Sequence, residues 1–260
     1  MMTLYKILLE SVVLLLKRPK LFVPRLITTF LYSLYTLFIA RFTIDVINFN
    51  LHENFFGFVM PRISAMLLAV IILYFIDIVS YAMYPALLRD YKMGKKIELI
   101  KAFKESISLW RLLLVMGVIT FVFIFIIMAI LSLFIFLTII LNNPYLLIIP
   151  GFIAVIGILI FVILMFFVIP IAVIENKGPI QSIRESICLG LRYKGDLLKV
   201  NLFFLVLICV SFIVIIMTEM NISDMVSISA IILFIVARVF QAIIYTYICV
   251  ANPYLYLVRK

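Results

Sequence analysis

The chain has 260 residues, of which 67% are hydrophobic and only 13% are charged. Soluble domains are about 45–50% apolar and about 25% charged, so this chain is far more apolar and less charged than a soluble domain. Its mean hydropathy of +1.34 agrees, and a soluble globular protein is excluded. In lipid, the backbone N–H and C=O groups of an uninterrupted apolar segment can all form hydrogen bonds within the segment only if it is a helix. The expected fold is therefore all-α. We expect a single integral membrane domain over 1–260, without a separate soluble domain.

The net charge of +10 comes from basic residues in short loops that flank apolar runs. Membrane orientation and anionic lipid headgroups explain this placement better than nucleic acid does. The expected partners are the lipid bilayer and anionic headgroups on the cytoplasmic side, and a membrane-protein partner stays open. Cys188, Cys209 and Cys249 lie on or near the apolar runs without a CxxC motif, so no disulfide framework is predicted.

Six apolar runs approach or exceed the length of about 20 residues that crosses a bilayer as a helix. A longer exterior loop is expected between the first and second spans, from Arg41 to Pro61. Short exterior turns join the third span to the fourth and the fifth to the sixth. The predicted spans are Leu21–Ala40, Ile63–Leu88, Leu112–Leu141, Leu146–Ile174, Val200–Met217 and Val226–Leu257.

The basic residues are distributed unevenly between the two sides of these spans. Of 22 Lys and Arg residues, 19 lie at the N-terminus, at the C-terminus and in the loops after the second and fourth spans. The opposite side holds Arg41 and Arg62, and Arg238 lies within a span. Because cytoplasmic loops are rich in Lys and Arg, both termini are expected in the cytoplasm and the protein in the plasma membrane.

A short segment with a Glu-Ser pair precedes each odd-numbered span. The pairs are Glu10-Ser11, Glu105-Ser106 and Glu185-Ser186, and the second and third lie 80 residues apart. This spacing predicts three repeats, over about 1–90, 91–176 and 177–260, each made of an interfacial helix and a helical hairpin.

Each even-numbered span carries a proline near its cytoplasmic end. These prolines are Pro85, Pro170 and Pro253, which lie 85 and 83 residues apart. Since proline lacks the N–H group and clashes with the preceding turn, each is expected to kink or end its helix. The chain would then turn into the next interfacial helix.

The central Glu-Ser segment, Ile97–Trp110, is amphipathic. Its apolar stripe at spacings of three and four contains Ile97, Ile100, Phe103, Ile107 and Trp110. Such a helix is too short and too charged to span, so it is expected at the interface, with the stripe in the acyl boundary or against the bundle.

Each motif glutamate lies four residues after a polar residue on its own helix. The expected pairs are Lys6 with Glu10, Lys101 with Glu105, and Gln181 with Glu185. Packing between repeats is favoured over a ring of three carboxylates that would bind a cation.

Polar residues within the spans are the candidates for function. Asp77 in the second span and Arg238 with Gln241 in the sixth form the candidate intramembrane polar site. An ionised side chain at mid-depth costs at least about 2.5–3.5 kcal/mol, so each should face protein or water. Asp77 and Arg238 are expected to compensate one another.

Catalytic motifs are missing from the sequence. It contains no HExxH, GxSxG, GxxxxGK[ST] or GxGxxG pattern, and His52 is the only histidine. We therefore expect neither an enzyme, nor a metal site, nor a cofactor; an intramembrane enzyme ranks third among the hypotheses.

The stretch from Pro170 to Ser186 reads P-x-x-x-x-E-N-K-G-P-I-x-S-I-R-E-S. With the repeated E-S segments, it resembles a loose group of prokaryotic six-helix membrane proteins that includes the membrane-anchor domain of glycerophosphodiester phosphodiesterases. In those enzymes hydrolysis belongs to a separate soluble domain, for which these residues offer no counterpart. The resemblance implies a fold and not an activity.

Two functions remain. The leading hypothesis is a scaffold or helper that organises lipids or partner proteins through basic interfacial helices. The alternative is a small-solute or ion transporter whose path is lined by Asp77 and Arg238, since transporters show internal repeats and midplane polar sites. A hydrated cavity around these two residues would favour transport, and a dry helix contact would favour the scaffold.

Overall fold

The computed structural model describes residues 3–47, 55–141, 143–219 and 228–260. Within these ranges the chain forms ten α-helices and two short 3-10 helices, without a strand. Six stretches are long and apolar enough to cross a membrane, which confirms the all-α fold and indicates a multi-pass membrane protein. They are Pro19–Val46, Phe56–Lys92, Trp110–Leu141, Tyr145–Glu175, Lys194–Thr218 and Ile231–Arg259.

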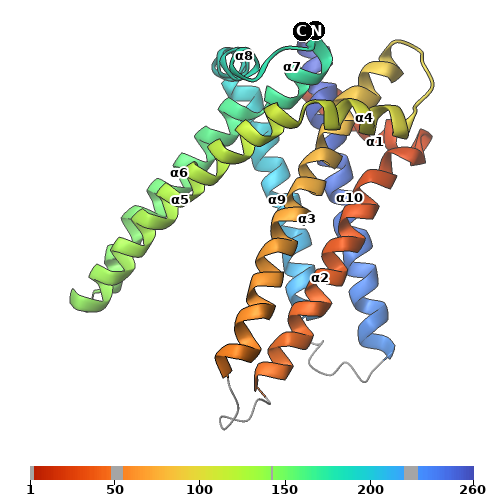
Figure 1. Cartoon of the computed structure of the whole chain (residues 1–260). Coiled ribbons are helices and arrows are strands. Elements are labelled where there is room, and N and C mark those ends of the chain that lie inside the picture. The colour runs from red at the N-terminus through yellow and green to blue at the C-terminus, as the bar shows by residue number, and fades with distance from the viewer. Residues whose placement is uncertain (1–2, 48–54, 142, 220–227) are drawn as a thin grey trace.

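Three short helices each precede a pair of long ones. The short helices are α1 (Leu4–Lys17), α4 (Leu99–Ser108) and α8 (Pro179–Arg192). The long segments are α2 (Val23–Ile47) with α3 (Phe55–Lys92), α5 (Trp110–Leu141) with α6 (Ile148–Met165) and α7 (Val168–Glu175), and α9 (Lys194–Glu219) with α10 (Ile228–Arg259); η1 (Pro19–Phe22) and η2 (Pro144–Leu147) are 3-10 turns. Helices α1, α4, α7 and α8 lie at the end that holds both termini, and we name them the termini layer (Figure 1).

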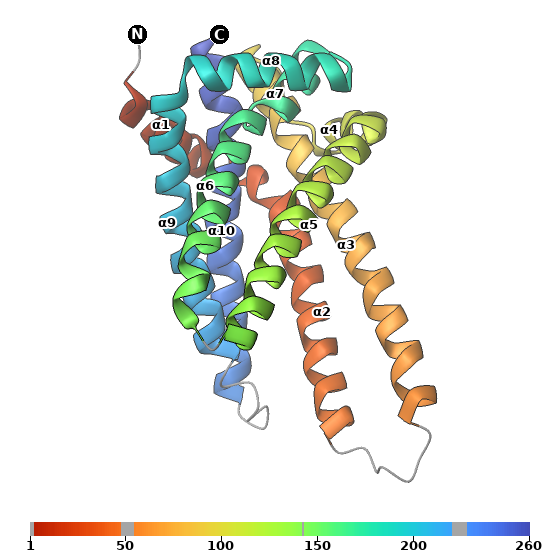
Figure 2. The same cartoon turned by 90° about the vertical axis from the view of Figure 1, so that its left-hand side faces the viewer.

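The long helices diverge away from the termini layer. Figure 1 shows the hairpin of α5 and α6 leaving this layer at an angle to α2, α3, α9 and α10. The view in Figure 2, turned by 90°, shows the same layer above all the long helices. The described helices therefore meet at one end of the molecule and separate toward the other.

Burial follows this arrangement, because the packed core lies next to the termini layer. Tyr84 of α3 is fully buried and its hydroxyl donates to the Leu21 carbonyl at 3.0 Å. Most other fully buried large side chains come from α1, α7 and the parts of α3, α9 and α10 nearest this layer. They include Ile7, Leu87, Leu88, Phe167, Ile171, Leu197 and Val250.

The fourth span is broken at Phe166 and Phe167, between α6 and α7. Pro170 has no N–H to donate to the Phe166 carbonyl four residues earlier. Asn252 of α10 supplies the missing donor, because its Nδ2 lies 2.9 Å from the Phe166 oxygen. Ser186 of α8 donates to the Leu164 carbonyl at 2.7 Å and accepts from the Phe167 N–H at 3.1 Å. Side chains from two other helices thus hold the break.

The other two prolines do not end their helices. Helix α3 continues past Pro85 to Lys92, and α10 continues past Pro253 to Arg259. The expectation of a helix end is therefore wrong for these two prolines, and a kink at either of them stays a prediction. Tertiary packing of the buried segments around them outweighs the loss of one backbone hydrogen bond.

The predicted exterior loop from Arg41 to Pro61 is also wrong at both ends, because α2 continues to Ile47 and α3 begins at Phe55. An ion pair between Arg41 Nε and Asp45 Oδ1, at 3.3 Å and one helical turn apart, supports the extension of α2. His52 lies outside the described residues.

The apolar stripe of Ile97–Trp110 faces away from the protein except at Ile97, which is partly buried against the core. Ile100, Phe103 and Ile107 are exposed, and the bundle contacts the small residues Ala102 and Ser106 instead. Small side chains let helix backbones approach closely, which explains the choice of this face. The stripe is left for lipid, and Trp110 begins α5 rather than ending α4.

Candidate functional site

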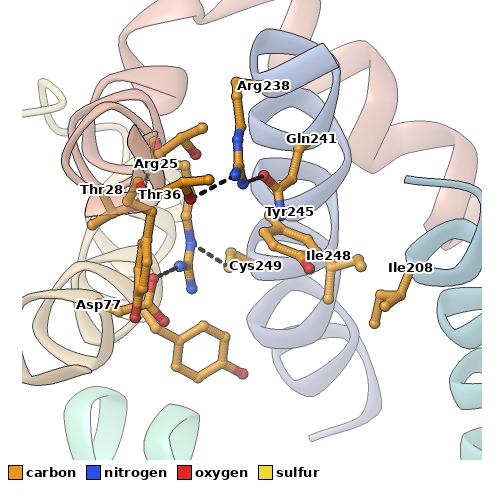
Figure 3. Close-up of a pocket in the computed structure, with 13 residues that line it drawn as sticks. Arg25, Thr28, Thr36, Asp77, Ile208, Arg238, Gln241, Tyr245, Ile248 and Cys249 are labelled. Atoms are coloured by element: carbon orange, nitrogen blue, oxygen red, sulfur yellow. Dashed lines mark hydrogen bonds and ion pairs between the residues drawn. The ribbon is translucent and has the colours of Figure 1, made fainter. Parts of the chain in front are cut away.

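A cavity of about 480 Å³ lies between α2, α3, α9 and α10 (Figure 3). Its volume is in the range of about 300–1,000 Å³ that is typical of small-molecule sites. We name it the intramembrane cavity. Most of the residues that line it carry a polar side-chain group, and the full set is Arg25, Thr28, Thr29, Tyr32, Thr36, Asp77, Tyr81, Ile208, Arg238, Gln241, Tyr245, Ile248 and Cys249.

All three residues of the predicted polar site line this cavity, but the predicted ion pair is wrong. Asp77 pairs with Arg25 of α2 and not with Arg238. The Arg25 side chain is only 8% exposed, whereas that of Asp77 is 33% exposed. Arg25 Nε also donates to the sulfur of Cys249 at 3.2 Å. The carboxylate therefore compensates a charge that is more deeply buried than its own.

Arg238 lies at the other end of the cavity. Its Nη2 donates to Thr36 Oγ1 at 2.8 Å, and its Nη1 donates to Gln241 Oε1 at 3.1 Å. The guanidinium also lies 5.1 Å from the centre of the Phe234 ring, within the range of a cation–π contact. Gln241 thus orients the arginine from one turn along the same helix.

The register of two antiparallel helices explains why Asp77 meets Arg25. Arg25 contacts Cys249, while Thr36 contacts Arg238, so the contacts are 11 residues apart along both α2 and α10. At about 1.5 Å per residue, the two arginines are separated by about 16 Å along the helices. Asp77 lies at the level of Arg25, and this separation rules out the Asp77–Arg238 contact.

Hydroxyl groups fill the wall between the two arginines. Thr28 donates to the Arg25 carbonyl at 3.1 Å, while the phenol rings of Tyr32, Tyr81 and Tyr245 line the same space. Guanidinium and hydroxyl groups are hydrogen-bond donors suited to an anion. The lining includes the guanidinium groups of Arg25 and Arg238 and the carboxylate of Asp77.

The sequence interpretation missed Arg25, Thr36 and Cys249. Arg25 is one of the 19 basic residues counted for the orientation of the chain, although it lies four residues beyond the start of the first predicted span. A basic residue inside an apolar run was the available signal. Thr36 and Cys249 carried no signal in the sequence, because threonine and cysteine are common in transmembrane helices.

The three motif serines are all fully buried. Ser11 donates to the Ile7 carbonyl at 2.9 Å and Ser106 to the Ala102 carbonyl at 2.8 Å, each within its own helix. Ser186 instead bonds across to the break between α6 and α7. The motif serines therefore mark the faces by which α1, α4 and α8 pack on the long helices.

The motif glutamates bind partners on different elements. Glu10 accepts from the Tyr254 hydroxyl at 2.5 Å, and Glu105 accepts from Arg89 at 2.7 Å, so the expected partners Lys6 and Lys101 are wrong. For Glu185 the expected bond from Gln181 is present at 3.1 Å, and Lys177 adds one at 2.6 Å.

The Lys177 ammonium donates hydrogen bonds to the carboxylates of Glu175 and Glu185, and these bonds raise its pKa. Among the described residues no group of three or more His, Cys, Asp and Glu is placed to hold a metal ion. The glutamates act as separate links between helices.

Comparison of the chain with protein-family models, with curated proteins and with solved structures finds no match. The class that the fold defines is that of multi-pass α-helical membrane proteins.

Proposed function

We propose that this chain is a membrane transport protein for a small anionic solute. The observation that carries the proposal is the intramembrane cavity, which gathers Arg25, Asp77 and Arg238 among hydroxyl groups within the predicted spans. Ionised residues at this depth are costly and mark substrate or ion pathways in transporters. A dry contact between helices would instead have supported the scaffold hypothesis.

The proposed arrangement in the membrane places both termini and the termini layer in the cytoplasm, in the plasma membrane. The excess of Lys and Arg on that side supports this orientation. Three repeats, each an interfacial helix followed by a hairpin, are supported by the order of the helices and by the burial of all three motif serines. The intramembrane cavity then lies between the first and third repeats.

In this proposal Arg25 and Arg238 have different roles. Arg25 is already compensated by Asp77, so it contributes a fixed pair at the end of the cavity nearer the termini layer. Arg238 donates to Thr36 and Gln241, and its guanidinium lines the other end of the cavity, where it would contact the solute. A planar guanidinium presents several donors in one plane and suits carboxylate or phosphate groups.

The native cysteine of the cavity provides the test. In a Cys188→Ser/Cys209→Ser background, Cys249 is the remaining thiol. The chain is reconstituted in liposomes and treated with two small methanethiosulfonate reagents, one carrying a sulfonate and the other a quaternary ammonium. We expect the anionic reagent to modify Cys249 faster, and Arg238→Gln to remove this preference.

The matched control is Arg62→Gln. Arg62 is an arginine of α3 whose guanidinium donates to its own helix, at the Phe58 carbonyl, and which does not line the cavity. This variant should leave the preference unchanged. A Cys249 that reacts with neither reagent, in protein that is folded by circular dichroism, contradicts a hydrated cavity and therefore transport.

The proposed orientation is tested with Cys188, an exposed residue of α8 in the termini layer. A membrane-impermeant maleimide should label it in inside-out vesicles and not in intact cells. Cys209 in the middle of α9 is exposed on a lipid-facing surface and should stay unlabelled by this aqueous reagent. Labelling of Cys188 in intact cells would place the termini outside.

The scaffold function remains a second candidate because of the outward faces of α1 and α4. Their apolar residues are exposed, including Leu9 and Leu16 of α1 and Ile100 of α4, next to several lysines. Amphipathic helices with this pattern lie in the membrane interface. Under this function, loss of the intramembrane charge at Arg238 would leave activity unchanged.

A further inference from the structure

A second cavity, of about 640 Å³, opens in the termini layer and is separate from the intramembrane cavity. It is lined by the end of α1, by η1 and by the turn between α3 and α4. Helices α1 and α4 lie at the end of the molecule that holds both termini (Figure 1). We name it the basic cavity. Its lining residues are Lys17, Arg18, Pro19, Lys20, Gly94, Lys95, Lys96, Ile97 and Glu98.

The backbone on both sides of the basic cavity is fixed. Helix α3 ends in a left-handed Gly94 with φ of 70°, a conformation that glycine adopts without a steric cost. The Gly94 N–H donates to the Tyr91 carbonyl at 3.0 Å and the Lys95 N–H to the Asp90 carbonyl at 2.9 Å, which is the Schellman pattern. This turn directs Lys95 and Lys96 toward the end of α1.

The opposite wall is equally well defined. The Arg18 N–H donates to the Leu14 carbonyl at 3.0 Å and ends α1, and Pro19 then opens η1. The Arg18 guanidinium lies 6.0 Å from the centre of the Tyr91 ring, which links the two walls. The cations are therefore presented by two rigid turns and not by a loose loop.

These five cations are uncompensated. Glu98 is the one carboxylate among the lining residues, and none of the ion pairs of the described residues involves Lys17, Arg18, Lys20, Lys95 or Lys96.

Elsewhere in the termini layer, Arg89 pairs with Glu105 at 2.7 Å and Lys101 pairs with Asp90 at 3.1 Å. Like charges around one cavity repel each other, and an anion with more than one charge would relieve that repulsion.

We infer that the basic cavity binds the two phosphate groups of an anionic membrane lipid. Five cations against one carboxylate match a ligand that carries two phosphates better than one with a single phosphate. Exposed apolar side chains lie close in sequence to the lining residues: Leu16 of α1 directly precedes Lys17, and Ile100 of α4 lies two residues after Glu98. These give the acyl chains of a lipid a surface that a soluble phosphate would not use.

The inference rests on the interfacial placement of α1 and α4 and not on transport. It is tested by native mass spectrometry of the full chain in detergent, titrated with cardiolipin, which has two phosphates, with phosphatidylglycerol, which has one, and with phosphatidylcholine. Cardiolipin should bind about tenfold more tightly than phosphatidylglycerol, since each basic residue near an anionic lipid contributes about fivefold. Inorganic pyrophosphate is titrated in parallel as a soluble source of the same groups.

The test variant is Lys17→Gln/Lys95→Gln/Lys96→Gln, which removes three exposed cations from both walls. Its cardiolipin affinity should fall at least about tenfold. The charge-preserving Lys17→Arg/Lys95→Arg/Lys96→Arg variant should retain that affinity. The matched control, Arg184→Gln/Lys194→Gln/Lys199→Gln, removes the same charge from exposed positions of α8 and α9 and should change it less than about twofold.

Three results overturn the inference. The first is an equal loss in the test and control variants, which would assign the binding to general surface charge. The second is equal affinity for cardiolipin and phosphatidylglycerol. The third is pyrophosphate binding as tight as cardiolipin binding, which would identify a soluble ligand. The anion preference of Cys249 in the test variant should stay intact, so this site and the transport function fail separately.

Discussion

The hairpin of α5 and α6 and the group of α2, α3 and α10 are all long and apolar enough to cross a membrane, but they differ in their charged residues. Residues 112–141 and 148–165 contain no charged side chain. The group of α2, α3 and α10 carries Arg25, Asp77 and Arg238. The hairpin diverges from the other helices (Figure 1), while the polar group encloses a cavity.

The difference shows that apolar residues do not mark the interior of this protein as they do in a soluble protein. In α5 the buried residues of the described helix are Leu112, Leu113 and Met116, next to the termini layer, and the rest of its surface is left for lipid. Polar residues, by contrast, are excluded from lipid and must find protein partners or water. In this molecule the polar residues Arg25, Asp77 and Arg238 therefore line a cavity inside the protein, whereas most of α5 lies outside the packed core.

The largest expected effect is loss of the ion pair inside the polar group. Asp77→Asn leaves the buried Arg25 guanidinium without its carboxylate and should lower the free energy of unfolding by about 3 kcal/mol. Thermal unfolding in detergent measures this effect. The double variant Arg25→Leu/Asp77→Leu should recover most of the loss, because no charge is then left uncompensated.

The control for this pair lies on the same helix. Arg41 and Asp45 also form an ion pair, but the Arg41 side chain is 75% exposed. Asp45→Asn should therefore cost only about 0.3–0.5 kcal/mol. Similar losses in the two single variants would show that the Arg25–Asp77 pair is not buried as described.

The second prediction concerns the contact between the hairpin and the termini layer. A Cβ atom on Gly190 of α8 would lie 2.8 Å from the Ile163 carbonyl oxygen and 3.3 Å from Leu164 Cα. Gly190→Ala should therefore push α8 away from α6 and cost about 1–3 kcal/mol in thermal unfolding.

Gly195→Ala, at a helical position where a Cβ would meet nothing within 4 Å, provides the comparison. It should be neutral or stabilise by up to about 1 kcal/mol. Equal behaviour of the two alanines would refute the close approach of α8 to the hairpin.

The third prediction separates the motif serines. Ser186→Ala removes a hydrogen bond to the Leu164 carbonyl and leaves the buried Phe167 N–H without its acceptor, at a cost of about 1–2 kcal/mol. Ser106 bonds only a carbonyl of its own helix, so Ser106→Ala should change stability by less than about 0.5 kcal/mol. Thermal unfolding of both variants in the same detergent shows which substitution destabilises the protein more.

Much of the fold could be predicted from the sequence. Segments such as Leu112–Leu141 are apolar throughout, and only a helix satisfies such a backbone in lipid. The short helices were found from the period of apolar residues around Glu105. Helix ends were predicted less well. Polar residues near the membrane surface, such as Asp45, are compatible with helix and with loop, so the sequence pattern does not indicate that α2 continues past Arg41 to Ile47.

The site could be predicted only in part. Asp77, Arg238 and Gln241 stand out because polar residues are rare in apolar runs, and the structure brings them to one cavity. Their pairing depends on the register of α2 against α3 and α10, which no local pattern encodes. The contacts of Arg25 and Arg238 lie 11 residues apart on these helices, so about three turns of helix separate the observed partner of Asp77 from the expected one.

The smallest expected effect belongs to the hairpin. Leu133 lies in α5 and is 56% exposed. Lipid tails are as apolar as leucine, so no hydrophobic driving force holds this side chain against the protein. Leu133→Ala should therefore change the free energy of unfolding by less than about 0.5 kcal/mol, whereas in water the same exposed leucine would still gain from partial burial.

The matched substitution on the same helix is Leu113→Ala. Leu113 is only 2% exposed and packs against the core next to the termini layer, so its truncation leaves a cavity and should cost about 2–5 kcal/mol. Thermal unfolding in detergent compares the two. If Leu133→Ala destabilised the chain as much as Leu113→Ala, the far end of α5 would be packed against protein. The divergence of the hairpin from the polar group, and with it the contrast between a lipid-facing and a site-forming half, would then be wrong.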